Sequence, residues 1–250
     1  MHILGIIPAR FGSSRLPGKP LRDICGKPMI QHVYERAARA RTVDRLIVAT
    51  DDQRIVDVVT SFGGEAYLTS KDHKTGSDRI AEVAKNIDCD FVVNIQGDEP
   101  LISPEIIDEF VEEQLRNPDI DMITGCYQIL DERLYENPNV VKVVTDKDGY
   151  ALMFSRSLIP YPRNREQFAV YEHIGIYVYS KAFLLLYKDL PETPLSYTES
   201  LEQLKAMENG YRIKVVTTKH PYNALSVDTI EDLHEVERIM RTLPGYSQLG

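Results

Sequence analysis

The chain begins with an apolar run that ends in a loop rich in cations and glycines. The run covers residues 2–7, and the loop, residues 8–20, contains Arg10, Arg15 and Lys19. Glycine lets a backbone come close to an anion, and cationic side chains bind phosphate. The sequence therefore predicts a strand that leads into a loop suited in size and charge to a nucleoside triphosphate.

The spacing within this loop excludes a Walker A motif. Five residues separate Gly12 from Gly18 where that motif has four, and Pro20 stands where its Ser or Thr hydroxyl would reach magnesium. A solvated turn that is merely basic is the alternative interpretation of the loop.

The charge balance argues against nucleic acid as a partner. With a net charge of −9, the chain lacks the basic surface that general nucleic-acid binding requires. Its 250 residues, of which 43% are hydrophobic, can form one large α/β domain or a domain with a subdomain. No run of about 20 apolar residues predicts a membrane span, and no apolar leader predicts export. Cys25, Cys89 and Cys126 form no Cys-x-x-Cys pair, which fits reduced thiols in a cytoplasmic protein.

Strand and helix patterns alternate in the N-terminal part of the chain. Apolar residues at helical spacing predict a helix over 29–41, a short apolar strand follows at 45–50, and a second helix ends at Gly63 and Gly64. This order indicates a right-handed crossover and a mostly parallel sheet with helices on both faces. Ligands of such sheets bind beyond the carboxyl ends of the strands.

Carboxylates follow predicted strands at two places. The buried strand 90–95 leads into Gln96, Gly97 and Asp98. A carboxylate there is costly unless a cation lies against it, and oxygen ligands suit a hard divalent cation. Asp228 takes a similar place before the last helix, where Thr229 is the expected N-cap and Asp232 completes a capping-box pattern. An ordinary turn aspartate is the alternative at both positions.

A polar loop at 71–79 leads into another predicted helix. Thr75 or Ser77 can cap this helix, and its N-terminus could donate hydrogen bonds to a base or ribose. A capped surface helix without a ligand is the alternative.

The chain changes character between about 128 and 180. Strands are predicted at 140–145, 151–154 and 174–179, with a hairpin signal at 148–149. We interpret this region as a β-rich extension within a single domain, at which a second subunit could dock. The remaining elements are helices at 180–186 and 197–207, a strand at 213–217 and an amphipathic helix after 229.

Taken together, these motifs resemble the 3-deoxy-manno-octulosonate cytidylyltransferases, also called CMP-Kdo synthetases, over nearly the whole chain. Each motif is weak on its own, and the order of all eleven carries the resemblance. The motifs lie at residues 7–10, 14–21, 26–30, 49–51, 75–79, 96–100, 141–144, 154–156, 173–177, 201–204 and 227–229.

The resemblance implies the α/β fold of the nucleotide-diphospho-sugar transferases, which is Rossmann-like, usually in a homodimer. It implies a magnesium-dependent enzyme that joins CTP to the anomeric hydroxyl of 3-deoxy-manno-octulosonate (Kdo), an anionic 2-keto-3-deoxy sugar acid, and releases pyrophosphate. The product, CMP-Kdo, would serve lipopolysaccharide or capsule synthesis. The resemblance implies no nucleic-acid or membrane partner.

The resemblance also implies roles for individual residues. Arg15, Lys19, Asp98 and Asp228 would be catalytic, with the two aspartates as magnesium ligands. The nucleotide would be bound by Pro8, Ala9, Arg10, Ser13, Ser14, Arg15, Lys19, Thr75, Ser77 and Gln96. The sugar acid would be bound by Arg156, His173, Tyr177, Glu202 and Gln203, and the Arg156 cation would offset its carboxylate.

Two departures from the family pattern leave the sugar open. Ser196 lies where the family usually has a Glu, and Ser226 and Ile230 replace the customary Gly and Pro on either side of the Val-Asp-Thr motif. An 8-amino-Kdo or another ulosonic acid is therefore an alternative substrate. A non-catalytic CTP-binding module is a further alternative, whereas the Gly-Gly-x-Gly-Thr-Arg loop of the sugar-1-phosphate nucleotidyltransferases is absent.

Overall fold

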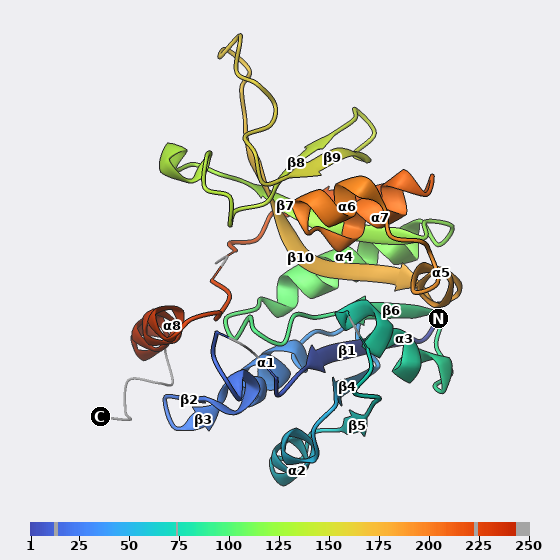
Figure 1. Ribbon diagram of the computed structural model, residues 1–250, viewed down its shortest axis with the longest axis vertical. Coiled ribbons are helices and arrows are strands. Elements are labelled where there is room, and N and C mark those ends of the chain that lie inside the picture. Colours follow the sequence, from blue (N-terminus) through green and yellow to red (C-terminus); the bar gives the residue numbers. More distant parts are fainter. Residues whose placement is uncertain (13–14, 74, 223–224, 244–250) are drawn as a thin grey trace. The chain divides into compact units, whose positions relative to one another are not determined.

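The computed structural model describes residues 1–12, 15–73, 75–222 and 225–243. The chain forms two compact units (Figure 1). The first unit contains the chain up to Asp108 and again from Tyr222 onward, and the second unit is Glu109–Pro221. The predicted β-rich extension, 128–180, falls within the second unit. Its place in a single domain stays a prediction.

The first unit is built on a parallel sheet with the strand order β6-β1-β4-β5. The strands are β1 (Ile3–Ala9), β4 (Arg45–Thr50), β5 (Ala66–Leu68) and β6 (Phe91–Asn94). Every residue of β6 is buried, as in a strand that is covered on both faces. The prediction of a strand at 45–50 is confirmed.

Three helices connect these strands. They are α1 (Met29–Ala37), α2 (Gln53–Ser61) and α3 (Gly76–Lys85). Because such crossovers are right-handed, the reversal of direction between β5 and β6 puts α3 on the face opposite α1 and α2. The strand order also changes direction between β1 and β6. Open α/β sheets bind ligands in the crevice that lies beyond the carboxyl ends of the strands at such a point.

The first strand extends two residues further than the apolar run predicts. Pro8 and Ala9 belong to β1 and pair with Ala49 and Thr50 of β4. On the other side, the pairing of β1 with β6 ends at Ile6 and Asn94. Pro8 is tolerated because β1 has only one neighbour at this point, and a proline without an N–H group fits an edge.

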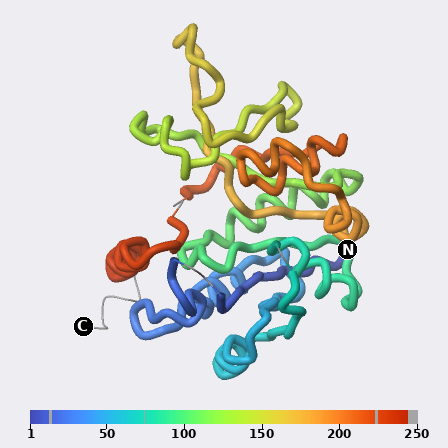
Figure 2. Tube along the Cα trace, viewed as in Figure 1, coloured from blue at the N-terminus to red at the C-terminus, as the bar shows by residue number. Residues whose placement is uncertain are grey.

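The last helix returns to the loop that follows β1. Figure 2 shows α8 (Ile230–Thr242), in red, beside the blue segment that contains β2 (Asp23–Ile24) and β3 (Lys27–Pro28). Leu233, Val236 and Met240 of α8 are buried in one cluster with Leu16 and Ile24. The predicted capping box of Thr229 and Asp232 is confirmed. A short 3-10 helix, η1 (Lys19–Leu21), forms the end of the loop.

The second unit has a mixed sheet. Here β7 (Met122–Gln128) pairs in parallel with β11 (Ile213–Thr217) and antiparallel with β10 (Tyr171–Ser180), while β8 (Lys142–Thr145) pairs antiparallel with both β10 and β9 (Ala151–Ser155). Its helices are α5 (Lys181–Tyr187), α6 (Pro194–Glu199), α7 (Glu202–Glu208) and the 3-10 helix η2 (Glu132–Leu134), and α4 (Pro104–Arg116) crosses the boundary between the units along the chain. Gly125 lets α4 pack on β7, since a Cβ atom there would lie 1.8 Å from Cζ of Phe110.

The prediction of one helix over 197–207 is wrong. The segment forms α6 and α7, which are separated at Ser200, whose φ of 52° is left-handed. The Glu199 carboxylate accepts hydrogen bonds from Ser155 Oγ at 2.6 Å and Arg156 N at 3.0 Å, and these contacts hold the end of α6. Helical periodicity in sequence does not report such tertiary contacts.

Buried cysteines and short helices complete the description. Cys25, Cys89 and Cys126 are buried, and no disulfide joins them. Within the described ranges, no helix combines the length and the apolar character that a membrane crossing needs.

Candidate active site

Lys19 lies between two carboxylates in the first unit. Its Nζ is 2.8 Å from Oδ2 of Asp98 and 3.1 Å from Oδ1 of Asp228. Arg15, in the loop after β1, contacts the Asp228 carboxylate as well, with Nη2 3.1 Å from Oδ2. The structure therefore brings together all four residues that the sequence assigned to catalysis.

Secondary structure places each member of this cluster. Asp98 follows β6, and its carbonyl accepts a hydrogen bond from Val227 N at 2.9 Å. This backbone contact holds Asp228 beside Asp98. Asp228 precedes the N-cap of α8, and its N–H donates to Oδ2 of Asp232 at 3.0 Å. The 3-10 helix η1 supplies Lys19.

The electrostatics of the cluster favour a charged lysine. Only 15% of the Lys19 side chain is exposed, against 66% for Arg15. Burial, the largest single influence, lowers the pKa of Lys19. The charges and hydrogen bonds of Asp98 and Asp228 outweigh it, so the net pKa is raised above its ordinary value. Lys19 is therefore an ammonium at neutral pH, and it compensates much of the negative charge of the pair.

Gly97 allows the chain after β6 to approach Pro8, and Gly76 lies in ordinary contact distance of the same residue. A Cβ atom on Gly97 would lie 2.5 Å from the Pro8 carbonyl oxygen, and one on Gly76 would lie 3.6 Å from Pro8 Cγ. Gly97 lies between Gln96 and Asp98, and Gly76 lies between Thr75 and Ser77. The predicted nucleotide-binding residues Pro8, Thr75, Ser77 and Gln96 therefore come from segments that meet at the end of β1. Ala9 is buried at this end, and Arg10 after it is exposed.

The N-terminus of α3 is capped as predicted. Thr75 accepts a hydrogen bond from Asp78 N at 3.1 Å, and Asp78 in turn accepts one from Thr75 N. Ser77 is buried in the first turn, which leaves Thr75 as the cap.

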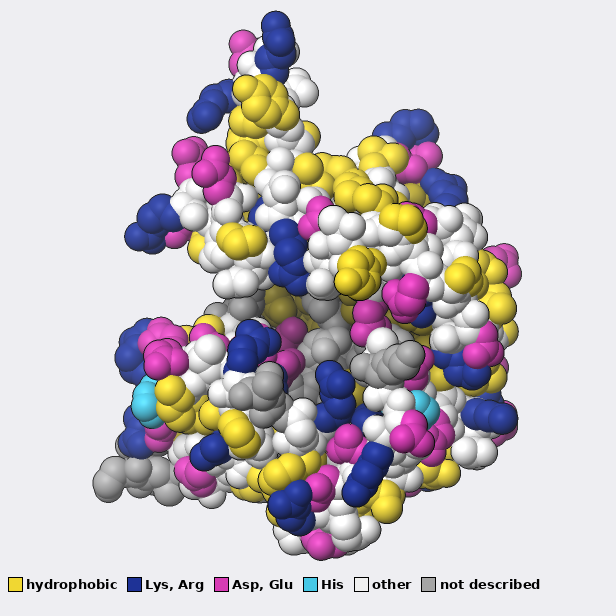
Figure 3. Space-filling view, viewed as in Figure 1, with side chains coloured by type: hydrophobic (Ala, Val, Ile, Leu, Met, Phe, Trp, Pro, Cys, Tyr) yellow, Lys and Arg dark blue, Asp and Glu magenta, His cyan; other side chains and the backbone are white. Residues whose placement is uncertain are grey.

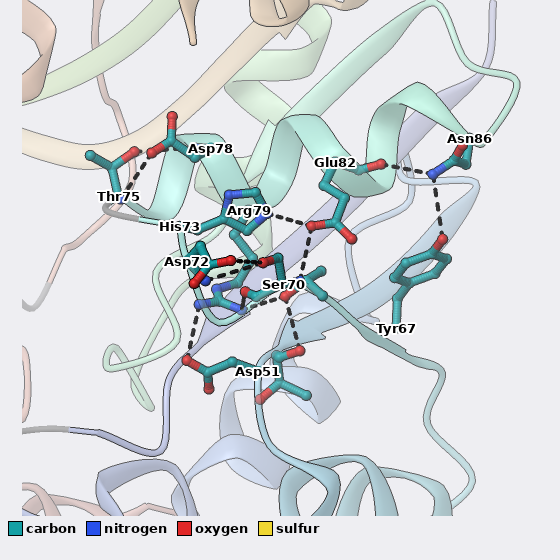
Figure 4. A network of polar contacts seen from close by, with 12 residues as sticks. Asp51, Tyr67, Ser70, Asp72, His73, Thr75, Asp78, Arg79, Glu82 and Asn86 are labelled. Carbon is teal, nitrogen blue, oxygen red and sulfur yellow. Dashed lines mark hydrogen bonds and ion pairs between the residues drawn. The ribbon is translucent and has the colours of Figure 1, made fainter.

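A buried arginine fixes the start of α3 to two strand ends. Figure 4 shows Arg79 pointing to Asp51 after β4, with Nη2 3.1 Å from Oδ2. Its Nη1 donates to Oγ1 of Thr69 and, at 3.3 Å, to the carbonyl of Ser70. Burial lowers the pKa of Arg79, the Asp51 charge opposes this, and the nearby positive charge of Arg10 adds to the lowering. The sequence motif included Arg79 and Asp51 without a role for either. A carboxylate directly after a buried strand was the signal that could have found them.

The paired aspartates fit a hard cation. They already hold one cationic group, and Mg²⁺ typically takes one or two carboxylates and completes its octahedron with water and substrate phosphates. Within the described ranges, no group of three or more His, Cys, Asp or Glu side chains converges to hold a metal. Asp98 and Asp228 form a pair of carboxylates, the number that Mg²⁺ ordinarily takes from a protein when phosphate and water supply its other ligands.

The predicted sugar-binding residues belong to the second unit, where Arg156 binds backbone carbonyls. Its Nε donates to Glu199 O at 2.8 Å, Nη1 to Pro138 O at 2.9 Å and Nη2 to Ser200 O at 3.5 Å. Beside it, the buried Lys142 ammonium donates to the carbonyls of Asn137, at 3.0 Å, and Arg156. These contacts fix the position of Arg156. No pattern in the sequence indicates the Glu199 contact.

His173 and Tyr177 lie in an aromatic row on β10. Their ring centroids are 5.4 Å apart, and Phe154 packs edge-on against His173 at 5.0 Å. Nε2 of His173 is 3.0 Å from Oγ1 of Thr124. The Thr124 hydroxyl also donates to the carbonyl of Ile174, where the irregular part of β10 begins. Burial lowers the pKa of His173 to about 3, so the imidazole is neutral at pH 7.

Glu202 and Gln203 begin α7. Glu202 has an exposed side chain, and its carbonyl accepts a hydrogen bond from Tyr187 Oη at 2.6 Å. Gln203 is 3% exposed, and among the described residues its Nε2 has no hydrogen-bond partner. The predicted nucleotide-binding residues Ser13 and Ser14 lie outside the described residues.

The chain is similar over most of its length to known cytidylyltransferases. A family model described as Cytidylyltransferase matches residues 4–214. A 3-deoxy-manno-octulosonate cytidylyltransferase of Trichlorobacter lovleyi is 51% identical, over 96% of this chain and 99% of that protein. One of Syntrophotalea carbinolica is 52% identical, over 97% of this chain and 100% of that protein.

Solved structures extend the similarity to the fold. A CMP:2-keto-3-deoxy-manno-octonic acid synthetase complexed with CTP is 44% identical with a TM-score of 0.90, and the match covers 96% of this chain and 98% of that one. A 4-diphosphocytidyl-2C-methyl-D-erythritol synthase of Anaerococcus prevotii is 18% identical with a TM-score of 0.63, over 96% of each chain. The second likeness concerns the fold alone. Together with the topology, these neighbours confirm the predicted fold class.

Proposed function

This chain belongs to the 3-deoxy-manno-octulosonate cytidylyltransferase family, and on that premise we propose that it transfers the cytidylyl group of CTP to the anomeric hydroxyl of Kdo. The products are CMP-Kdo and pyrophosphate. Relatives that bear this name are about half identical over nearly the whole chain. We place the activity, as a further part of the proposal, in lipopolysaccharide or capsule synthesis.

One observation supports the assignment of nucleotide binding to the first unit. Lys19 and Arg15 converge with Asp98 and Asp228 beyond the carboxyl ends of β1 and β6. Cations suit a triphosphate, and paired carboxylates suit the magnesium that accompanies it.

The residues of this cluster act by position and charge. Lys19, Arg15 and Arg10 bind the triphosphate and stabilise the charge that grows on the departing pyrophosphate. The sugar hydroxyl attacks the α-phosphorus directly, so the chain needs no nucleophile of its own. Asp98 and Asp228 would hold Mg²⁺, which when bound neutralises phosphate charge and lowers the pKa of a coordinated hydroxyl. The cytidine lies against Gln96 and against the capped N-terminus of α3, which includes Thr75 and Ser77.

The sugar acid is assigned to residues of the second unit. Arg156 supplies the positive charge that an anionic sugar requires, and the carbonyls around it hold the guanidinium in one orientation. Neutral His173 and Tyr177 offer polar groups on a rigid aromatic row. Gln203 supports the assignment, because its buried amide nitrogen has no partner among the described residues, and such a group is costly unless a ligand satisfies it.

Ser196 keeps the identity of the sugar open. It is buried at the third position of α6, where its Oγ accepts the capping-box hydrogen bond from Thr193 N at 3.3 Å. Glu208 of α7 accepts hydrogen bonds from Leu195 N and Ser196 N at 3.1 and 3.2 Å, so a carboxylate still meets this helix end. This difference from the family pattern is the reason to test 8-amino-Kdo and other ulosonic acids beside Kdo.

The test is a pyrophosphate-release assay with CTP, Mg²⁺ and a panel of ulosonic acids. We expect release with Kdo or a close analogue and none without a sugar acid. CTP binding without release from any member of the panel would contradict the enzyme assignment and leave a nucleotide-binding module. The ranking of kcat/KM across the panel identifies the substrate.

We further propose a homodimer that forms through the second unit. Figure 3 shows exposed apolar side chains, in yellow, over the region where Figure 1 labels β8 and β9. Leu152 is 61% exposed, Leu130 85% and Tyr161 86%. Large exposed apolar groups favour a protein interface. Sedimentation analysis of Leu152→Lys, with Leu68→Lys of the first unit as control, tests the interface, since only the former should yield monomers.

A further inference from the structure

Phe11 is an aromatic residue within the polar loop that follows β1. The guanidinium carbon of Arg54 lies 3.4 Å from the centroid of its ring. The proposed function gives a role to the cations of the loop but not to the Phe11 ring.

The backbone of Phe11 joins two points of the loop and connects the loop to the turn after β4. Its carbonyl accepts a hydrogen bond from Gly18 N at 3.2 Å, and its N–H donates to Oδ1 of Asp51 at 3.4 Å. Gly18 has a φ of 66°, and its Cβ position lies 3.3 Å from the Phe11 ring. A side chain at Gly18 would be strained and would meet the ring, so glycine allows this closure.

The residues that hold Phe11 are themselves fixed. Asp51 pairs with the fully buried Arg79. Arg54 forms a two-point contact with Asp52, with Nε 2.8 Å from Oδ1 and Nη2 2.6 Å from Oδ2. Asp52 also caps α2. The turn between β4 and α2 therefore holds Phe11 at two points, its backbone N–H and its ring. We call this arrangement the Phe11 clamp and define it as Phe11, Gly18, Asp51 and Arg54.

We propose that Phe11 is a positioning residue for nucleotide binding: the Phe11 clamp fixes the loop so that Arg15 and Lys19 are preorganised for the triphosphate. This inference rests on the proposed function, because it takes CTP as the ligand of the loop. The clamp does not touch the reacting atoms. It acts on binding, by removing loop freedom before the nucleotide arrives.

The effect should appear in affinity more than in turnover. Loss of a cation–π contact at an exposed site corresponds to about 3-fold weaker CTP binding in Arg54→Met. Loss of the ring in Phe11→Ala releases the loop further, and we expect about 10-fold weaker binding. At saturating CTP, kcat should stay within about 2-fold of wild type, because the bound nucleotide reorders the loop.

Calorimetric titration of CTP without sugar measures the affinities of wild type, Phe11→Ala and Arg54→Met. Arg238→Met is the matched control, since Arg238 is an exposed arginine with a similar contact to Glu235. Wild-type affinity in both clamp variants would overturn the proposal. A similar loss in the control would overturn it as well, because charge alone would then explain the effect.

A second readout needs no nucleotide. Trypsin can cut after Arg15, and its rate reports how often the loop opens. We expect faster cleavage at Arg15 in both clamp variants and an unchanged rate in Arg238→Met. An unchanged rate in the clamp variants would overturn the clamp. Failure of the proposed function would instead appear as absent CTP binding by the wild type, so the two failures are distinguishable.

Discussion

Nζ of Lys19 lies 2.8 Å from Oδ2 of Asp98 while it also reaches Asp228, so a single ammonium joins the turn after β6 to the start of α8. Two neighbouring negative charges repel one another unless a cation lies between them. Lys19 provides that cation within the chain itself. The geometry therefore makes three charged residues one electrostatic unit, and a change to any of them alters the other two.

Asp98→Asn and Asp228→Asn should each abolish turnover and keep the fold. Removal of one carboxylate weakens the binding of a hard cation, which depends on ligand charge. Pyrophosphate release over a magnesium titration measures the effect, and circular dichroism measures the fold. Asp57→Asn, on the exposed side of α2, is the control. A variant at position 98 or 228 with a near-wild-type rate at low magnesium would show that the altered residue is not a ligand.

Lys19→Met should bind Mn²⁺, used as a probe without nucleotide, more tightly than the wild type. The ammonium and the metal would share the same two carboxylates, and removal of the ammonium leaves the full negative charge to the metal. We expect at least about 3-fold tighter binding, measured by electron paramagnetic resonance. CTP affinity should fall in the same variant. Mn²⁺ binding equal to the wild type would argue that Asp98 and Asp228 do not form the metal site.

Gly97→Ala should destabilise the protein, because the added Cβ would lie 2.5 Å from a backbone oxygen that cannot move aside cheaply. We expect a loss of about 1–3 kcal/mol in the free energy of unfolding. Gly12→Ala is the control, since no atom of the described residues lies within 4 Å of the Cβ position there. Urea denaturation compares the two. Equal stability of Gly97→Ala and Gly12→Ala would mean that the segment at Pro8 shifts without cost.

Much of the first unit could be predicted from sequence because its strands and helices carry strong local periodicity. The strand 45–50 and the cap at Thr229 depend on neighbouring residues alone. The extension of β1 through Pro8 could not be predicted, since it depends on where β6 ends. The break at Ser200 depends on the distant residues Ser155 and Arg156 in the same way.

The candidate site also has features that the sequence could predict and features that it could not. Motif order named Lys19, Asp98 and Asp228 as candidates, yet no local pattern states that one lysine lies against both aspartates. The contacts of Arg156 with backbone carbonyls were equally hidden, because every carbonyl in a sequence looks alike. The sequence thus proposes candidate residues, and only the structure shows what holds them in place.

Arg156→Ala should weaken sugar binding and leave CTP affinity in the absence of sugar almost unchanged. The variant also removes three hydrogen bonds to carbonyls, so the free energy of unfolding should fall by about 1–2 kcal/mol. Arg156→Lys should not restore sugar affinity, since an ammonium cannot reproduce the planar fork. Calorimetry with CTP decides the assignment. A large loss of CTP affinity would place Arg156 on the nucleotide.

His173 should make the stability of the protein depend on pH in acid. Burial lowers its pKa to about 3 in the folded chain, whereas an unfolded histidine has a pKa of about 6.5. Between these values the unfolded state binds the proton and the folded state does not, so stability is lost as the pH falls below about 6.5. At pH 5 this loss reaches at most about 2 kcal/mol, and the partial exposure of the residue reduces it. Urea denaturation at pH 7 and pH 5 should show a smaller decrease in His173→Gln than in wild type, while His234→Gln, at an exposed position of α8, should follow the wild type. The same decrease in His173→Gln and wild type would mean that the imidazole is protonated without penalty.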